Sequence, residues 1–158
     1  QQIQSLWYDK PTKSLIAGTT MQADCESTPA KSDVCYFARI NADDLNAIDK
    51  ITAPSARVIG PMGRSRYLCQ AEKIFVLNLK TWAREELEYS GWRPIATGKP
   101  GWFVRRIKDQ IELWDMRVPR CERVLFKGYK GYRILVQEDS VYLVMPTEVV
   151  VLDRSLRA

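Results

Sequence analysis

Residues 102–118 read WFVRRIKDQIELWDMRV, and this stretch decides the class of fold that the sequence predicts. The runs WFVRRI and IELWDMRV are rich in β-branched and aromatic residues, which favour strands. The intervening KDQ is turn chemistry of hairpin length. The stretch therefore predicts an antiparallel β-hairpin.

Strand-like runs continue on both sides of this hairpin. Short turn segments part the runs WRPIAT, ERVLFKGY, YRILVQE, VYLVM and EVVVLD. Further upstream, VCYFARI, ARVIG, RYLCQ and EKIFVLNL have the same character. Val124 and Phe126 alternate with Arg123 and Lys127, as expected for an antiparallel sheet with one face in water. We expect a mostly antiparallel meander.

Two segments carry the signals of short helices. Asn41 is a suitable N-cap for the run NADDLNAIDKI, and Pro54 ends it. The positions of this run that follow helical spacing are Ala42, Leu45, Ile48 and Thr52. Thr81 caps a second run, WAREELEYS, which Gly91 ends. Two short helices beside a meander predict an α+β fold, and a barrel or sandwich decorated by helices is the alternative architecture.

Length and composition predict one globular domain. The chain has 158 residues, of which 46% are apolar, so a sizeable core can form over residues 1–158. Residues 1–33 form a less regular N-terminal segment. No run of about 18 apolar residues occurs, so no transmembrane segment is expected. The net charge of +5 favours anionic partners, but nucleic-acid binders show a stronger and more clustered excess, so nucleic acid is an unlikely partner.

Four cysteines bear on the compartment: Cys25, Cys35, Cys69 and Cys121. The sequence has no closely spaced cysteine pair and no histidine, which disfavours a zinc site or a redox pair. We favour one disulfide closing the turn-rich loop between Cys25 and Cys35 and another joining Cys69 to Cys121, and unlinked thiols are the alternative. With Gln1 as the first residue, this pattern predicts a mature periplasmic or secreted protein.

The absence of histidine removes the commonest general base, so no catalytic residue is nominated. Paired carboxylates remain an alternative route to catalysis, as in glycoside hydrolases. The candidate pairs are Glu112 with Asp115 and Glu138 with Asp139. No metal ligand or cofactor site is predicted.

Two regions are candidates for binding. The loop GPMGRSR (60–66) carries Arg64 and Arg66, which could address a carboxylate or phosphate, although an ordinary hairpin connection explains it too. Tryptophan and arginine interleave over residues 92–120, as at protein interfaces, although core tryptophans covered by arginines fit the same pattern. The nominated residues of this region are Trp102, Arg105, Arg106, Trp114 and Arg117. The run GYKGY (128–132) is interpreted as a hairpin tip with exposed tyrosines.

These observations favour an exported, non-catalytic binding protein of the bacterial envelope, of the inhibitor, immunity or assembly type. Its expected partner is another protein of the envelope. The alternative is a small secreted hydrolase that acts on an envelope glycan through paired carboxylates. The sequence carries no signal for the oligomeric state.

Overall fold

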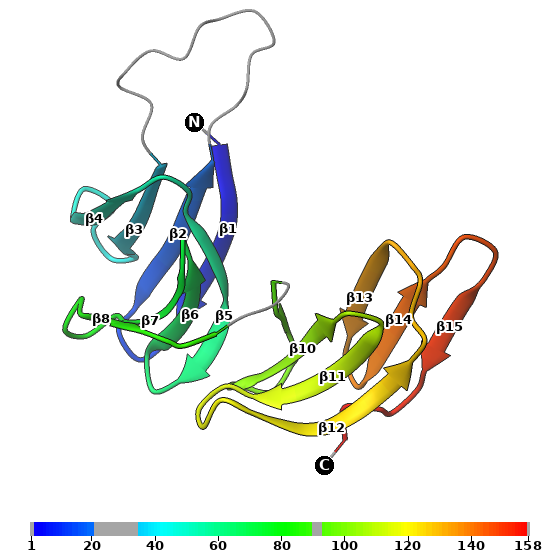
Figure 1. Ribbon diagram of the computed structural model, residues 1–158. Coiled ribbons are helices and arrows are strands. Elements are labelled where there is room, and N and C mark those ends of the chain that lie inside the picture. Colours follow the sequence, from blue (N-terminus) through cyan, green and yellow to red (C-terminus); the bar gives the residue numbers. More distant parts are fainter. Residues whose placement is uncertain (1, 21–34, 90–92, 158) are drawn as a thin grey trace, which may run out of the picture. The chain divides into compact units, whose positions relative to one another are not determined.

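The computed structural model describes residues 2–20, 35–89 and 93–157 (Figure 1). These residues form 15 β-strands, and none of them lies in a helix. The chain divides into two compact units, Gln1–Glu88 and Tyr89–Ala158, where the sequence predicted one globular domain. Within each sheet the strands follow one another in chain order and pair antiparallel.

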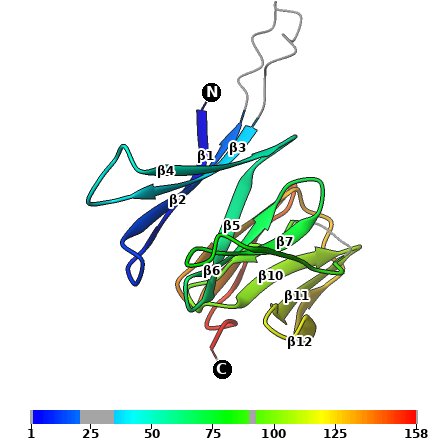
Figure 2. The same cartoon turned by 90° about the vertical axis from the view of Figure 1, so that its left-hand side faces the viewer.

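The first unit contains two sheets of four strands each in its described residues. The first sheet consists of β1 (Gln2–Asp9), β2 (Ser14–Thr20), β3 (Cys35–Asn41) and β4 (Ile48–Ala53). Its strands lie side by side in both views (Figures 1 and 2). The second sheet consists of β5 (Arg57–Gly63), β6 (Arg66–Gln70), β7 (Ile74–Asn78) and β8 (Arg84–Glu86). β1 and β2 occupy much of the segment that the sequence predicted to be less regular.

The core of the first unit lies between its two sheets. Ile16 and Phe37 of the first sheet pack with Phe75 and Leu77 of the second in one buried cluster. The rings of Phe37 and Phe75 meet edge to face, with their centroids 5.3 Å apart. This is the geometry that the quadrupoles of two aromatic rings favour.

The second unit also contains two sheets in its described residues. The four-stranded sheet consists of β9 (Ile95–Ala96), β10 (Trp102–Ile107), β11 (Gln110–Asp115) and β12 (Arg120–Lys127). The three-stranded sheet consists of β13 (Arg133–Gln137), β14 (Ser140–Val144) and β15 (Val149–Leu152). Val104 and Leu113 of the former join Val141 and Leu143 of the latter in a buried cluster. The hairpin predicted over 102–118 is confirmed as β10 and β11.

The α+β prediction is wrong. In the described residues, the two segments that were predicted to be helices form loops, turns and strands. In the first segment, the Asn41 side chain accepts a hydrogen bond from the backbone N–H of Asp43, and that of Asp44 accepts one from Asn46. Such local bonds compete with the helical pattern. The residues before β4 therefore form a loop, in which Leu45 is 65% exposed.

The second predicted helix is a tight turn followed by a short strand. Asn78 donates its backbone N–H to the carbonyl of Ala83, and its own carbonyl accepts from Trp82. Trp82 has φ of 59°, in the left-handed region that a right-handed helix excludes. The chain therefore turns at residues 79–83 and returns as β8, which pairs with β7. The part of the prediction that concerns Gly91 lies outside the described residues.

Candidate binding pocket

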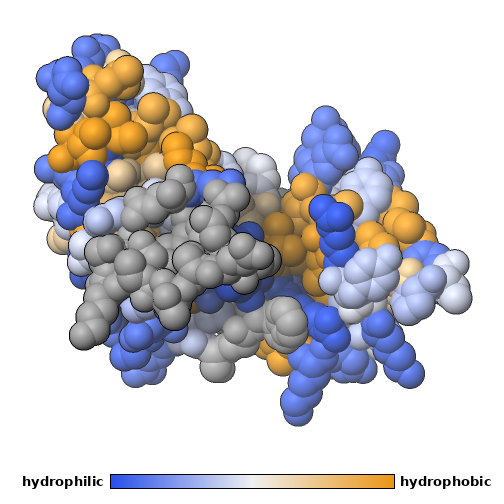
Figure 3. All heavy atoms as spheres, turned by 90° about the horizontal axis from the view of Figure 1, so that it is seen from above, coloured by the Kyte–Doolittle hydropathy of each residue, from blue (hydrophilic) through white to orange (hydrophobic). Residues whose placement is uncertain are grey.

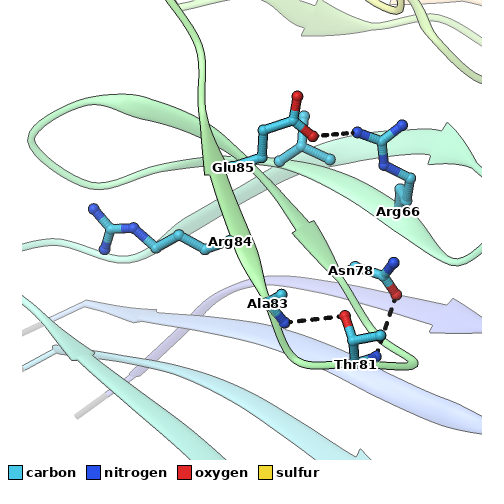
Figure 4. A pocket seen from close by; sticks show the side chains of 7 residues that line it. Arg66, Asn78, Thr81, Ala83, Arg84 and Glu85 are labelled. Carbon is cyan, nitrogen blue, oxygen red and sulfur yellow. Dashed lines mark hydrogen bonds and ion pairs between the residues drawn. The ribbon is translucent and has the colours of Figure 1, made fainter.

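Arg64 and Arg66 belong to the turn between β5 and β6. Arg64 and Ser65 have φ of 51° and 58°, as a two-residue type I′ hairpin turn requires. Arg64 is exposed, whereas Arg66 donates to Glu85 over 2.7 Å. Glu85 points toward Arg66 and Arg84 points away (Figure 4). The charge of Arg66 is therefore already matched by a carboxylate.

The hollow beside Arg66 is a surface depression over a turn. Asn78 accepts from the backbone N–H of Thr81, and Thr81 accepts from that of Ala83, so these side chains hold the β7–β8 turn (Figure 4). Their polar atoms are engaged within the fold. The nominated loop thus fits the hairpin connection that the sequence left as the alternative.

Arg105 and Trp114 lie in the buried part of the second unit. The guanidinium carbon of Arg105 is 3.6 Å from the centroid of the Trp114 ring and 4.9 Å from that of Tyr89. Trp114 donates its indole N–H to Glu112 over 2.6 Å, and Arg105 Nε lies 3.6 Å from the same carboxylate. The Arg105 side chain is only 7% exposed. At these two residues the geometry matches cation–π packing inside the fold.

Arg117 and Trp102 are also engaged within the second unit. Arg117 donates from Nε and Nη2 to the two carboxylate oxygens of Asp115, over 2.8 and 2.6 Å, and this hydrogen bonding lowers the pKa of Asp115. The ammonium group of Lys99 lies 4.1 Å from the centroid of the Trp102 ring. Two nominated residues therefore form intramolecular charge contacts.

Arg106 lines a second pocket, which lies in the second unit. Its Nε donates to the carbonyl of Lys108 over 2.9 Å, and its Nη1 donates to that of Gly131 over 3.2 Å. Its guanidinium carbon lies 4.9 Å from the centroid of the Tyr129 ring. These contacts fix the cation at the wall of the pocket.

The pocket is mostly apolar and cationic, with a volume of about 380 Å³. We call it the Arg93–Arg106 pocket, and its described lining is Arg93, Ile95, Arg106, Tyr129, Gly131, Tyr132 and Ile134. Among these described lining residues, two are cationic and none is acidic. Tyr132 is 75% exposed, so one aromatic ring of the lining remains accessible to a partner.

Gly131 shapes the pocket because no larger residue fits there. A Cβ on Gly131 would lie 2.2 Å from the carbonyl oxygen of Val144 and 2.5 Å from the Tyr129 ring. Tyr129 is buried and donates its hydroxyl to the carbonyl of Arg133 over 2.9 Å. Burial raises the pKa of Tyr129, and the charge of Arg106 opposes that rise. The floor of the pocket is thus a neutral, fixed phenol.

Two strand edges border the pocket. Ile95 lies on β9 and Ile134 on β13, and each of these strands is at the end of its sheet in the described part of the chain. Edge strands present backbone donors and acceptors along one side. The pocket therefore combines cations, an apolar floor and adjacent strand edges.

A second apolar surface lies on the first sheet. The cross-strand register aligns Tyr8, Leu15, Ile40 and Ile48 in one row across β1–β4. Figure 3 shows apolar residues reaching the surface beside hydrophilic ones. This row contains no charged side chain, so it specifies no ligand chemistry.

Three of the four nominated carboxylates are engaged in contacts within the fold. Glu112 binds Trp114, Asp115 binds Arg117, and Asp139 accepts from Arg157 over 2.6 Å. Glu138 lies in the β13–β14 turn with φ of 51°. Among the described residues, no group of three or more histidine, cysteine or acidic side chains is placed to hold a metal ion.

Cys35, Cys69 and Cys121 are free thiols in the structure, and Cys25 lies outside the described residues. Cys69 and Cys121 belong to different units of the chain, and the expected bond between them remains a prediction. Cys69 is enclosed in the core of the first unit, whereas Cys121 is exposed on β12 of the second. The Cys25–Cys35 bond and the exported location remain predictions.

No helix among the described residues has the length and hydrophobicity needed to cross a bilayer. The chain matches no known family model, and no similar sequence is found among curated proteins.

Proposed function

We propose that this protein is a binding protein that captures a protein partner at the Arg93–Arg106 pocket. The observation that carries the proposal is the pairing of two guanidinium groups with apolar walls, without an acidic residue in the described lining. A cationic, partly desolvated site attracts an anionic group and rejects a cationic one.

Arginine suits this role because its planar donors match the two oxygens of a carboxylate. Arg106 is held by two backbone carbonyls and lies over Tyr129, so little conformational entropy is lost when a partner binds. Arg93 is exposed and supplies a second positive charge. Together they provide affinity for an anion at a fixed position.

The apolar part of the lining supplies contact area. Tyr132 is exposed, and Ile95 and Ile134 extend the wall along two strands. Tyrosine and arginine are enriched among the residues that dominate protein–protein affinity. Ile95, Arg106 and Ile134 lie on strands, which hold this part of the lining in a fixed geometry. These features support a protein partner.

The exported, envelope-associated setting expected from the sequence is part of the proposal. It rests on the cysteine pattern, and binding at the pocket does not depend on it.

Affinity capture tests the proposed function. The wild-type protein is immobilised and exposed to an extract of the source cells, and retained proteins are identified by mass spectrometry. Arg93→Glu reverses one charge of the pocket, and Lys127→Glu makes the same change at an exposed residue outside its lining. We expect one set of proteins to be retained by the wild type and by Lys127→Glu, and lost with Arg93→Glu. Equal retention by all three proteins would contradict the proposal.

A further inference from the structure

Building on the proposed function, we infer that the Arg93–Arg106 pocket recognises the carboxy-terminal residue of a partner polypeptide, and that this residue has an aromatic or branched apolar side chain. The inference names the chemical class of the ligand. It follows from the charge, the size and the borders of the pocket.

The charge of the pocket calls for an anion. Arg93 and Arg106 are the charged residues of its described lining, and both are cationic. The guanidinium of Arg106 is anchored by the carbonyls of Lys108 and Gly131, so its position is set before a ligand arrives. A carboxylate is the common anion of unmodified polypeptides, and arginine binds it through paired hydrogen bonds.

The size of the pocket requires that the anionic group and the apolar side chain of the ligand belong to one residue. Its volume of about 380 Å³ is small, yet it combines the two cations with Ile95, Ile134 and the Tyr129 ring. In an extended peptide, successive side chains point to opposite faces, so an acidic residue and its apolar neighbour do not enter the same pocket. A carboxy-terminal residue carries its carboxylate and its side chain on one carbon atom. It therefore satisfies both parts of the lining at once.

The strand edges accommodate the residues that precede the terminus. β9 and β13, which carry Ile95 and Ile134 of the lining, each pair with a single strand in the described part of the chain, so each has one side without a strand partner there. An extended segment can add to such an edge through main-chain hydrogen bonds while a pocket reads its side chain. The pocket then supplies specificity and the edge supplies affinity.

A peptide array tests the inference. One set of random decapeptides is synthesised with free carboxyl ends, and an identical set is amidated, which removes the terminal charge. Both sets are probed with the labelled wild-type protein, Arg93→Gln and Lys127→Gln, whose folding is checked by circular dichroism. Arg106→Gln is a second probe, since it removes the anchored cation.

We expect the wild type and Lys127→Gln to bind free peptides that end in an apolar residue. We also expect at least tenfold weaker binding after amidation or with Arg93→Gln, because a charge-assisted hydrogen bond is worth a factor of this order. Equal binding of free and amidated peptides that still depends on Arg93 would overturn this inference and leave the proposed function intact. Binding that is unchanged in Arg93→Gln and Arg106→Gln, or no binding to either peptide set, would overturn both this inference and the proposed function.

Discussion

Arg105 and Glu112 face each other across β10 and β11, and both are buried, with Arg105 Nε 3.6 Å from Glu112 Oε2. Trp114 completes this group, because its ring stacks on Arg105 and its N–H binds Glu112. A buried pair of opposite charges is strongly interdependent: each charge offsets the desolvation of the other.

Loss of one member of this pair should destabilise the second unit. Arg105→Met leaves Glu112 buried without its countercharge, and we expect the free energy of unfolding to fall by about 3–5 kcal/mol. The double variant Arg105→Met/Glu112→Leu removes both charges and should recover most of that loss. Urea denaturation measures both quantities. A single variant as stable as the wild type would contradict the buried ion pair.

Gly131→Ala should be far more costly than Gly98→Ala. A methyl group at Gly131 would overlap the carbonyl of Val144 and the Tyr129 ring, whereas nothing lies within 4 Å of a Cβ at Gly98. We expect a loss of about 1–3 kcal/mol at Gly131, the usual cost of overpacking, and a change within about 0.5 kcal/mol at Gly98. Thermal unfolding compares the two. Similar melting temperatures would show that the pocket wall is not as tightly packed as described.

The ion pair between Asp115 and Arg117 predicts that part of the free energy of unfolding is lost in acid. Hydrogen bonding from Arg117 lowers the pKa of Asp115 below its ordinary value of 3.8. The stabilisation is therefore complete above that value and is lost as the pH falls through the lowered pKa of the folded state. Because Arg117 is partly exposed, we expect Asp115→Asn to cost about 1 kcal/mol near pH 6. The difference from the wild type should vanish near pH 2. A difference that is independent of pH would refute the assignment.

Thiol reactivity tests the sulfur chemistry. In a Cys25→Ser variant, we expect a thiol reagent to modify Cys121 in the native protein and to spare Cys35 and Cys69, which are buried. Although Cys121 is exposed, partial burial of its thiol raises the pKa, with a further contribution from Glu112, so its labelling rate should still increase above about pH 8.5. After unfolding without reductant, all three thiols should react. If only Cys35 reacts then, Cys69 and Cys121 are disulfide-bonded.

The strands were predictable where apolar and turn residues alternate clearly. The runs VLFK, RILVQ and VYLV each fall in a strand of the second unit, because short apolar runs between turn residues have few alternatives. By contrast, helical spacing was misleading in the two segments that were expected to be helices. The capping signal at Asn41 is real, but the same side-chain oxygen stabilises an isolated turn, and no apolar face of the segment is buried.

Of the residues nominated individually from the sequence, Arg106 is the one that lines the pocket, although Arg93 and Ile95 fall within the nominated region 92–120. Arg93, Ile95 and Ile134 come together only when β9 and β13 approach each other, which no local pattern reveals. The run GYKGY was predicted to be a hairpin tip with exposed tyrosines, and this is correct for only one of them. Tyr132 is exposed, but Tyr129 is buried as the floor of the pocket. The interleaved tryptophans and arginines led instead to the nomination of Arg105 and Trp114, which stabilise the fold.

The most direct test of the binding site is a titration of the isotope-labelled protein followed by nuclear magnetic resonance. N-acetyl-L-phenylalanine carries the carboxylate and the aromatic ring that the pocket is inferred to bind, and N-acetyl-L-phenylalaninamide lacks only the charge. We expect the acid to shift the amide resonances of Gly131 and Tyr132 in a saturable manner, and the amide to shift them at least tenfold more weakly. Saturable shifts elsewhere, or none at Gly131 and Tyr132, would contradict the claim that this pocket is the binding site.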